Sequence, residues 1–173
     1  ASLRQAAYET LSAIATGEHA SDLVELLDSS ETGDAEAIED AIYSAVEEAG
    51  SSQAQVQLLT QAFGKVSEQE QVHLIHLLAR IRGEDALKEV KSYLANPNLK
   101  EEAAAAAVHI ICPREGDGFG MRSQEAYDLL QKSIEILDDK DLIEKAKNHM
   151  PATLHDPDED GFVSLINGED MSG

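Results

Sequence analysis

Basic residues, aromatic residues and cysteine are all scarce in this 173-residue sequence. Only 13 Lys and Arg stand against 34 Asp and Glu, so the formal net charge is -21. A chain this acidic repels nucleic-acid phosphates and anionic membrane surfaces. The sequence also lacks any apolar run near the ~20 residues that a bilayer-spanning helix needs. These deficits argue against nucleic-acid partners and against membrane insertion.

The single cysteine, Cys112, excludes an intramolecular disulfide. It lies within the apolar segment "AVHIICP", where we expect a small buried hydrophobe rather than a nucleophile. The chain opens with "ASLRQAAYETL", which has helical periodicity and lacks the basic and apolar regions of a signal peptide. Because the first residues already follow helical periodicity, we expect the sequence to be a fragment of a longer protein. The length favours one main domain.

The residues that are abundant favour helices. Aromatic residues make up 4% of the chain, Trp is absent, and segments such as "KEEAAAAAVHII" consist of strong helix formers. Apolar residues recur at helical spacing, as at Ile38, Ile42 and Val46. The pattern predicts helices near residues 2–16, 20–29, 34–49, 52–66, 67–82, 84–95, 98–112, 122–137 and 139–149.

Four glycines mark a repeat. Gly17, Gly50, Gly83 and Gly116 lie 33 residues apart by subtraction (50 − 17, 83 − 50 and 116 − 83), and the first three each follow an amphipathic segment. Glycine adopts the left-handed conformation that ends many helices. A shorter second helix, such as "EDALKEVKSYLANP", follows each of them. The sequence therefore predicts an array of helical hairpins.

Polar residues at the predicted helix starts fit this array. Asp34, Ser52 and Ser67 each precede an apolar-periodic stretch, where a side-chain oxygen accepts a hydrogen bond from a first-turn amide. Ser67 and Glu70 also have the spacing of a capping box.

The period alone does not choose a repeat family, but the residues do. The stretch "EQVHLIHLLARIRGEDALKEVKSYLANPNLKEEAAAAAVHII" resembles short HEAT-like repeats across residues 67–112, and residues 2–66 resemble them more loosely. Residues 122–149 resemble a C-terminal cap. The resemblance implies an all-α, right-handed α-α superhelix, a solenoid of about four hairpins plus a capping helix, followed by a short irregular or extended tail.

Candidate chemical sites are few. His73 and His76 are three residues apart and share a helix face, but no acidic residue lies between them and no cysteine is near. We expect them to flank the buried apolar face of their helix, with one partly buried and one solvated, rather than to bind a metal. The glycine-rich residues 114–122, "REGDGFGMR", follow a predicted helix rather than a strand, which favours an inter-helix loop over a nucleotide site.

Carboxylates also have a simple interpretation. Pairs such as Glu47 with Glu48 and Asp138 with Asp139 are expected on solvated helix faces and ends rather than in a catalytic pair. The sequence therefore predicts no catalytic residue, no cofactor and no metal ligand for this fragment.

The closing stretch "DPDEDGFVSLINGEDMSG" differs in character from the rest. Asp156, Asp158, Asp160 and the following Gly161 match the opening of an EF-hand loop. Asn167 stands at the twelfth position, where a bidentate Glu is required, and a proline lies inside the loop. An acidic linker is therefore favoured, with calcium binding left open as an alternative.

The last part of the tail, "GFVSLINGEDMSG", resembles the opening of the bacterial 3-keto-disaccharide hydrolase family. That resemblance implies a downstream concanavalin-like β-sandwich acting on sugars and a periplasmic or cell-envelope setting. None of that family's catalytic residues transfers to this chain. The matching residues are Gly161, Phe162, Ser164, Leu165, Asn167, Gly168, Asp170, Ser172 and Gly173, and the departures are Ile166, Glu169 and Met171.

These patterns predict a HEAT-like repeat domain over residues 1–150 and a linker with the truncated start of a sugar-active domain over 151–173. The expected function is a non-catalytic scaffold. Its concave face, formed by second helices that carry Leu23–Leu27 and Val56–Phe63, would hold a partner protein or the adjacent domain. The alternative is a small-molecule-binding or lyase-type enzyme related to the HEAT-like phycobilin lyases, and a calcium-regulated linker is a third possibility.

Overall fold

A computed structural model describes residues 3–28, 34–64, 66–114 and 120–154. Within these ranges the chain is helical and contains no strand, which confirms the predicted all-α class. The acidic stretch from Asp156, with its alternative interpretation as a calcium loop, and the sugar-domain start lie outside the described residues. The helices are α1 Leu3–Ile14, α2 Ala20–Asp28, α3 Ala35–Glu47, α4 Ser52–Phe63, α5 Glu68–Leu78, α6 Glu84–Tyr93, α7 Lys100–Ile111, α8 Gln124–Ile136 and α9 Lys140–Thr153, with a 3-10 turn at Gly17–His19.

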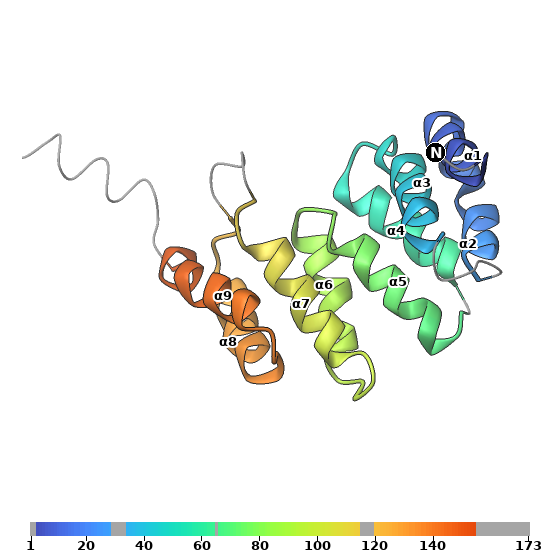
Figure 1. Ribbon diagram of the computed structural model, residues 1–173. Coiled ribbons are helices and arrows are strands. Elements are labelled where there is room, and N and C mark those ends of the chain that lie inside the picture. The colour runs from blue at the N-terminus through green and yellow to red at the C-terminus, as the bar shows by residue number, and fades with distance from the viewer. Residues whose placement is uncertain (1–2, 29–33, 65, 115–119, 155–173) are drawn as a thin grey trace, which may run out of the picture.

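The helices stack as successive hairpins in an elongated array (Figure 1). The first helices form one row, in which α1 packs on α3, α3 on α5, α5 on α7 and α7 on α9. The second helices α2, α4 and α6 form the other row, and each also packs on the first helix of the next hairpin. Helices α1 and α9 therefore lie at opposite ends (Figure 1). This arrangement confirms the hairpin array, while its right-handed sense and its HEAT-like family stay predictions.

One hydrophobic core runs through the whole array, from Ala15 to Ala146. The predicted stripe of Ile38, Ile42 and Val46 is fully buried. Helix α7 fills its part of the core with small side chains. Its fully buried or nearly buried alanines are Ala103, Ala104, Ala106 and Ala107.

Polar contacts tie the hairpins together at intervals close to the repeat length. The Ser52 hydroxyl donates to Asp85 Oδ2 at 2.9 Å, across 33 residues. The Arg114 guanidinium donates to the carbonyl of Arg80 at 3.1 Å and to that of Ala79. The Arg80 guanidinium in turn lies 4.0 Å from the centroid of the Tyr43 ring. The two bonds from Arg114 satisfy carbonyls just after the end of α5, where helix carbonyls lack intrahelical partners.

The helix starts follow the predictions in part. The capping box of Ser67 and Glu70 is confirmed. Asp34 does occupy the N-cap position of α3, but its side chain makes no capping bond and accepts one from the Tyr8 hydroxyl at 3.3 Å. The prediction for Ser52 is wrong by one residue, because Ser51 caps α4 by accepting from the Ala54 amide.

Several helix ends also differ from the predictions, and α5 ends at Leu78 rather than at the predicted residue 82. Helix α4 ends at Phe63, before the predicted residue 66, because Gly64 has φ 30°. Helix α9 continues past the predicted residue 149 to Thr153, with Pro151 inside it. Proline lacks an amide hydrogen, so it removes one helical hydrogen bond. In the last turn this loss is small enough for the helix to continue.

The backbone at two repeat glycines requires the absence of a side chain. Gly50 has φ 82°, and a Cβ there would meet nothing within 4 Å. Gly83 has φ 120° and ψ 173°, and its Cβ would lie 3.2 Å from Ser52 Oγ. Gly83 therefore combines the more restricted backbone with a close neighbour.

We expect Gly83→Ala to lower the free energy of unfolding by about 2–3 kcal/mol and Gly50→Ala by about 1 kcal/mol. The difference arises because Gly83 has the more restricted backbone and because only its Cβ would crowd Ser52. Urea unfolding followed by far-ultraviolet circular dichroism measures both values. Equal losses in the two variants would show that the contact with Ser52 is unimportant.

Candidate functional site

Three successive first helices bring four polar side chains together along one side of the array. Glu39 lies on α3, His73 and His76 lie on α5, and Glu102 lies on α7. The core residues next to them determine this placement. Leu74 and its α5 neighbours Ile75, Leu77 and Leu78 are buried, so the two histidines stand at the margin of the apolar stripe.

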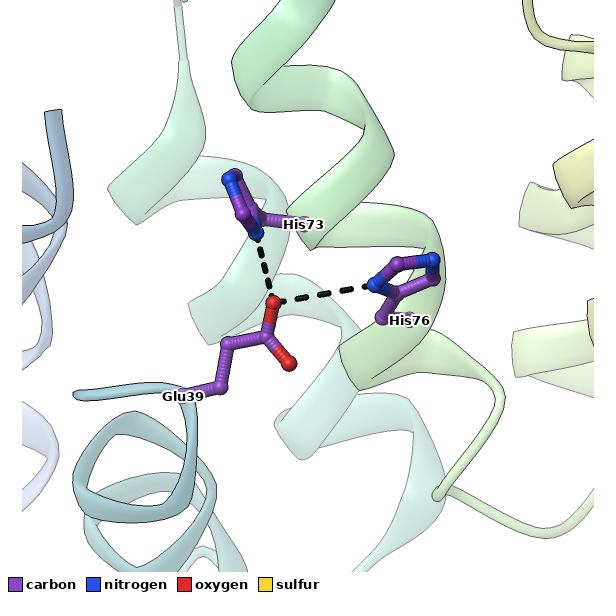
Figure 2. A group of neighbouring side chains, drawn as sticks. All are labelled: Glu39, His73 and His76. Atoms are coloured by element: carbon purple, nitrogen blue, oxygen red, sulfur yellow. Dashed lines mark hydrogen bonds and ion pairs between the residues drawn. The ribbon is translucent and has the colours of Figure 1, made fainter. Parts of the chain in front are cut away.

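The Glu39 carboxylate lies between the two imidazole rings (Figure 2). Its Oε1 is 2.6 Å from His73 Nδ1 and 3.7 Å from His76 Nδ1. The opposite ring nitrogen of His76, Nε2, lies 3.1 Å from Glu102 Oε2. A continuous chain of polar contacts therefore joins α3, α5 and α7. We call these four residues the histidine–carboxylate cluster.

The cluster changes the protonation behaviour of its members. Burial alone would raise the pKa of Glu39, but hydrogen bonds and positive charge from His76 and His73 lower it below its ordinary value of 4.5. The hydrogen bond to Glu39 raises the pKa of His76 above 6.5, against the effect of burial, and Glu102 adds to this. The cluster therefore favours an ionised carboxylate beside a protonated imidazole.

The same atoms are also a metal-donor set. Within the part of the chain that the structure describes, Glu39, His73 and His76 are the one group of three such side chains whose donor atoms lie within 4.8 Å of one another. Imidazole nitrogens with a carboxylate oxygen are typical zinc ligands. The cluster can therefore hold either a proton or a divalent cation.

The sequence correctly placed the two histidines but missed their acidic partner. The side chain of His73 is 27% exposed and that of His76 is 45% exposed, as expected for residues flanking the stripe. No acidic residue lies between them in sequence, yet Glu39 approaches from a position 34 residues before His73. The 33-residue glycine period was the signal that could have paired these positions.

The other candidate residues have structural roles. Cys112 is fully buried, its Sγ donates to the Lys145 carbonyl at 3.8 Å, and burial raises the pKa of its thiol to about 11. Its predicted role as a buried hydrophobe is confirmed. Asp139 caps α9 by accepting from the Asp141 and Leu142 amides, and Glu47 lies in the last turn of α3 and is exposed.

A shallow depression of about 490 Å³ lies where Pro113 meets α9. It is lined by Asp141, Glu144, Lys145 and His149, among others. The His149 ring is buried, and its Nε2 lies 3.3 Å from the Met121 carbonyl oxygen. This contact gives the imidazole a structural role at the junction between α9 and the segment before α8.

No protein-family model matches the sequence, and searches of curated proteins and of solved structures return no significant match. None of the helices in the described ranges has both the length and the apolarity needed to cross a bilayer.

The charged groups that face His76 are Glu39 and Glu102, and their effect gives a pH dependence with a definite sign. Because folding raises the pKa of His76, its contribution to stability is fully present below about pH 6.5 and is lost as the pH rises through the raised value. Because folding lowers the pKa of Glu39, its contribution is present above about pH 4.5 and is lost at lower pH.

We therefore expect His76→Gln, in the presence of a chelator, to reduce the free energy of unfolding more at about pH 6 than at about pH 8.5. Since His76 is half-exposed, the difference is expected to be at most about 1 kcal/mol. Urea unfolding of both proteins at the two pH values measures it. The exposed Glu101→Gln variant is the control and should show no such difference.

For Cys112 we expect negligible reaction with a thiol-specific disulfide reagent at about pH 8 in the native state, because the reactive thiolate is disfavoured by burial. Complete reaction is expected once the protein is unfolded in guanidinium chloride. Rapid native-state labelling would contradict the buried placement.

Proposed function

We propose that this chain is a non-catalytic scaffold that binds a polypeptide partner along the face formed by the second helices α2, α4 and α6. One observation carries the proposal. The three helices pack side by side, and the central helix of the three, α4, contains no charged residue in a chain whose net charge is -21.

The exposed side of α4 consists of glutamines. Gln53, Gln57 and Gln61 are exposed and recur every four residues, so they share one face of the helix. We call these three residues the glutamine stripe. Glutamine supplies both hydrogen-bond donors and acceptors without a charge to desolvate. Depletion of charge at the centre of a surface patch is typical of protein interfaces, whose rims are polar.

The neighbouring helices place charge on either side of the glutamine stripe. On α2, Asp22 and Glu25 are exposed, and on α6, Glu84, Lys88 and Lys91 are exposed. Lys91 also pairs with Glu125 of α8 at 2.5 Å. An uncharged centre with an acidic flank on α2 and a flank of mixed charge on α6 suits a partner segment that presents basic residues toward α2, because such complementarity orients an encounter.

The large apolar residues of α2 and α4 are part of the core. Leu23 and Leu27 of α2, and Val56, Leu59 and Phe63 of α4, are buried. In the proposed scaffold these residues hold the helices in place. The exposed residues between them would contact the partner. The sugar-active domain implied by the resemblance of residues 161–173 is one candidate occupant of the face.

We expect Gln53→Glu with Gln57→Glu to weaken partner binding by at least about tenfold, because charge at the centre of an interface must be desolvated. The substitutions are isosteric and lie on an exposed helix face, so circular dichroism should be unchanged. Pull-down from a lysate of the source organism identifies the partner, and biolayer interferometry with the purified partner measures affinity.

A control with the same charge change uses the exposed Gln69→Glu and Gln131→Glu, which lie on α5 and α8. This control is expected to bind as the wild type does. If both double variants retain full affinity for every partner captured, the α2–α4–α6 face is not the binding surface. A small molecule bound at the depression beside Pro113, with catalytic turnover, would favour the lyase-type alternative instead.

A further inference from the structure

We propose that Glu39, His73 and His76 form a binding site for a divalent transition-metal ion, with Zn²⁺ as the reference ion, between helices α3 and α5. The site is separate from the proposed partner face, since its residues lie on first helices rather than on α2, α4 and α6. Its ligands come from the first helices of adjacent hairpins, so the ion would link one hairpin to the next.

The donor spacing fits a small tetrahedral ion. Zinc binds imidazole nitrogen at about 2.0–2.1 Å and carboxylate oxygen at about 2.0–2.2 Å, which places neighbouring donors about 3.3 Å apart at the tetrahedral angle. Glu39 Oε1 lies 2.6 Å from His73 Nδ1 and 3.7 Å from His76 Nδ1. These distances bracket the required value, so modest side-chain rotations bring the three donors to one ion.

The orientation of His76 supports the same conclusion. Metal-binding histidines usually donate their second ring N–H to a carboxylate or carbonyl, which fixes the tautomer that presents a lone pair to the metal. Here His76 Nε2 lies 3.1 Å from Glu102 Oε2, while Nδ1 faces Glu39 (Figure 2). Glu102 is therefore assigned as the positioning residue, which holds His76 without itself binding the ion.

The donor types select the class of metal. Two imidazole nitrogens with one carboxylate favour Zn²⁺, Co²⁺ or Ni²⁺ over Ca²⁺ and Mg²⁺, which prefer oxygen ligands. The His76 side chain is 45% exposed and that of Glu39 is 16% exposed, so the ion can reach the site from solvent. Three protein ligands leave the fourth tetrahedral position for water.

The proposal is tested with the full chain, purified without a polyhistidine tag and freed of metal by a chelator. Titration with Zn²⁺ at about pH 7.5, where neutral imidazole is available, is expected to show saturable binding of one ion per chain by calorimetry. Bound Zn²⁺ is also expected to raise the thermal midpoint, because it binds the native state. Titration with Co²⁺ is expected to produce the visible absorption of a tetrahedral complex.

Variants assign the binding to these residues. We expect His73→Gln, His76→Gln and Glu39→Gln each to lower Zn²⁺ affinity at least about tenfold and to abolish the cobalt spectrum, and Glu102→Gln to lower affinity about 10- to 100-fold. His19→Gln and Glu101→Gln remove a histidine and a carboxylate elsewhere and are expected to bind as the wild type does. Circular dichroism verifies that each variant is folded.

Absence of saturable Zn²⁺ binding by the wild type would overturn the proposal. So would Zn²⁺ binding that the folded His73→Gln and His76→Gln variants retain at full affinity, since the ion would then lie elsewhere in the chain. Neither result would affect partner binding through the glutamine stripe, so the two proposals are tested separately.

Discussion

Burial of each hairpin against its neighbours is the constraint on which this structure depends. A helix such as α3 has one apolar stripe, with Ile38, Ile42 and Val46 fully buried, and the surfaces that cover it come from α1, α2, α4 and α5. No hairpin can bury such a stripe by itself. Stability is therefore shared between adjacent units, as in other repeat arrays.

The acidity of the chain adds a second constraint, which contacts between hairpins offset locally. Glu39 contacts two histidines, and Asp40 pairs with Arg80 at 2.7 Å. Glu68 accepts from Asn96 at 2.8 Å and Asn98 at 2.9 Å. The Asp40–Arg80 and Glu68 contacts are exposed and contribute little alone, whereas the Glu39 contacts are partly buried. Together they place carboxylates beside basic or hydrogen-bond-donating groups from later in the chain, which reduces repulsion between acidic helices.

The sequence was sufficient for features that depend on local chemistry. Helical periodicity predicted every described α-helix, and Ser67 with Glu70 revealed a cap because both partners lie within one turn. Features that depend on distant residues were missed. Asp34 bonds to Tyr8 instead of to its own helix, and Glu39 meets His73 only after α3 and α5 have packed. Periodicity gives the face of a helix, whereas such pairs need the relative positions of two helices.

Helix α7 shows how residues without functional groups can shape a helical array. Ala103, Ala104, Ala106 and Ala107 are buried where α7 packs against α5, α6, α8 and α9. Short side chains allow helix axes to approach closely, so these four residues influence how near α7 lies to its neighbours. Larger side chains at this seam would push α8 and α9 away from α7, so alanine here determines how closely the last two helices approach the preceding hairpins.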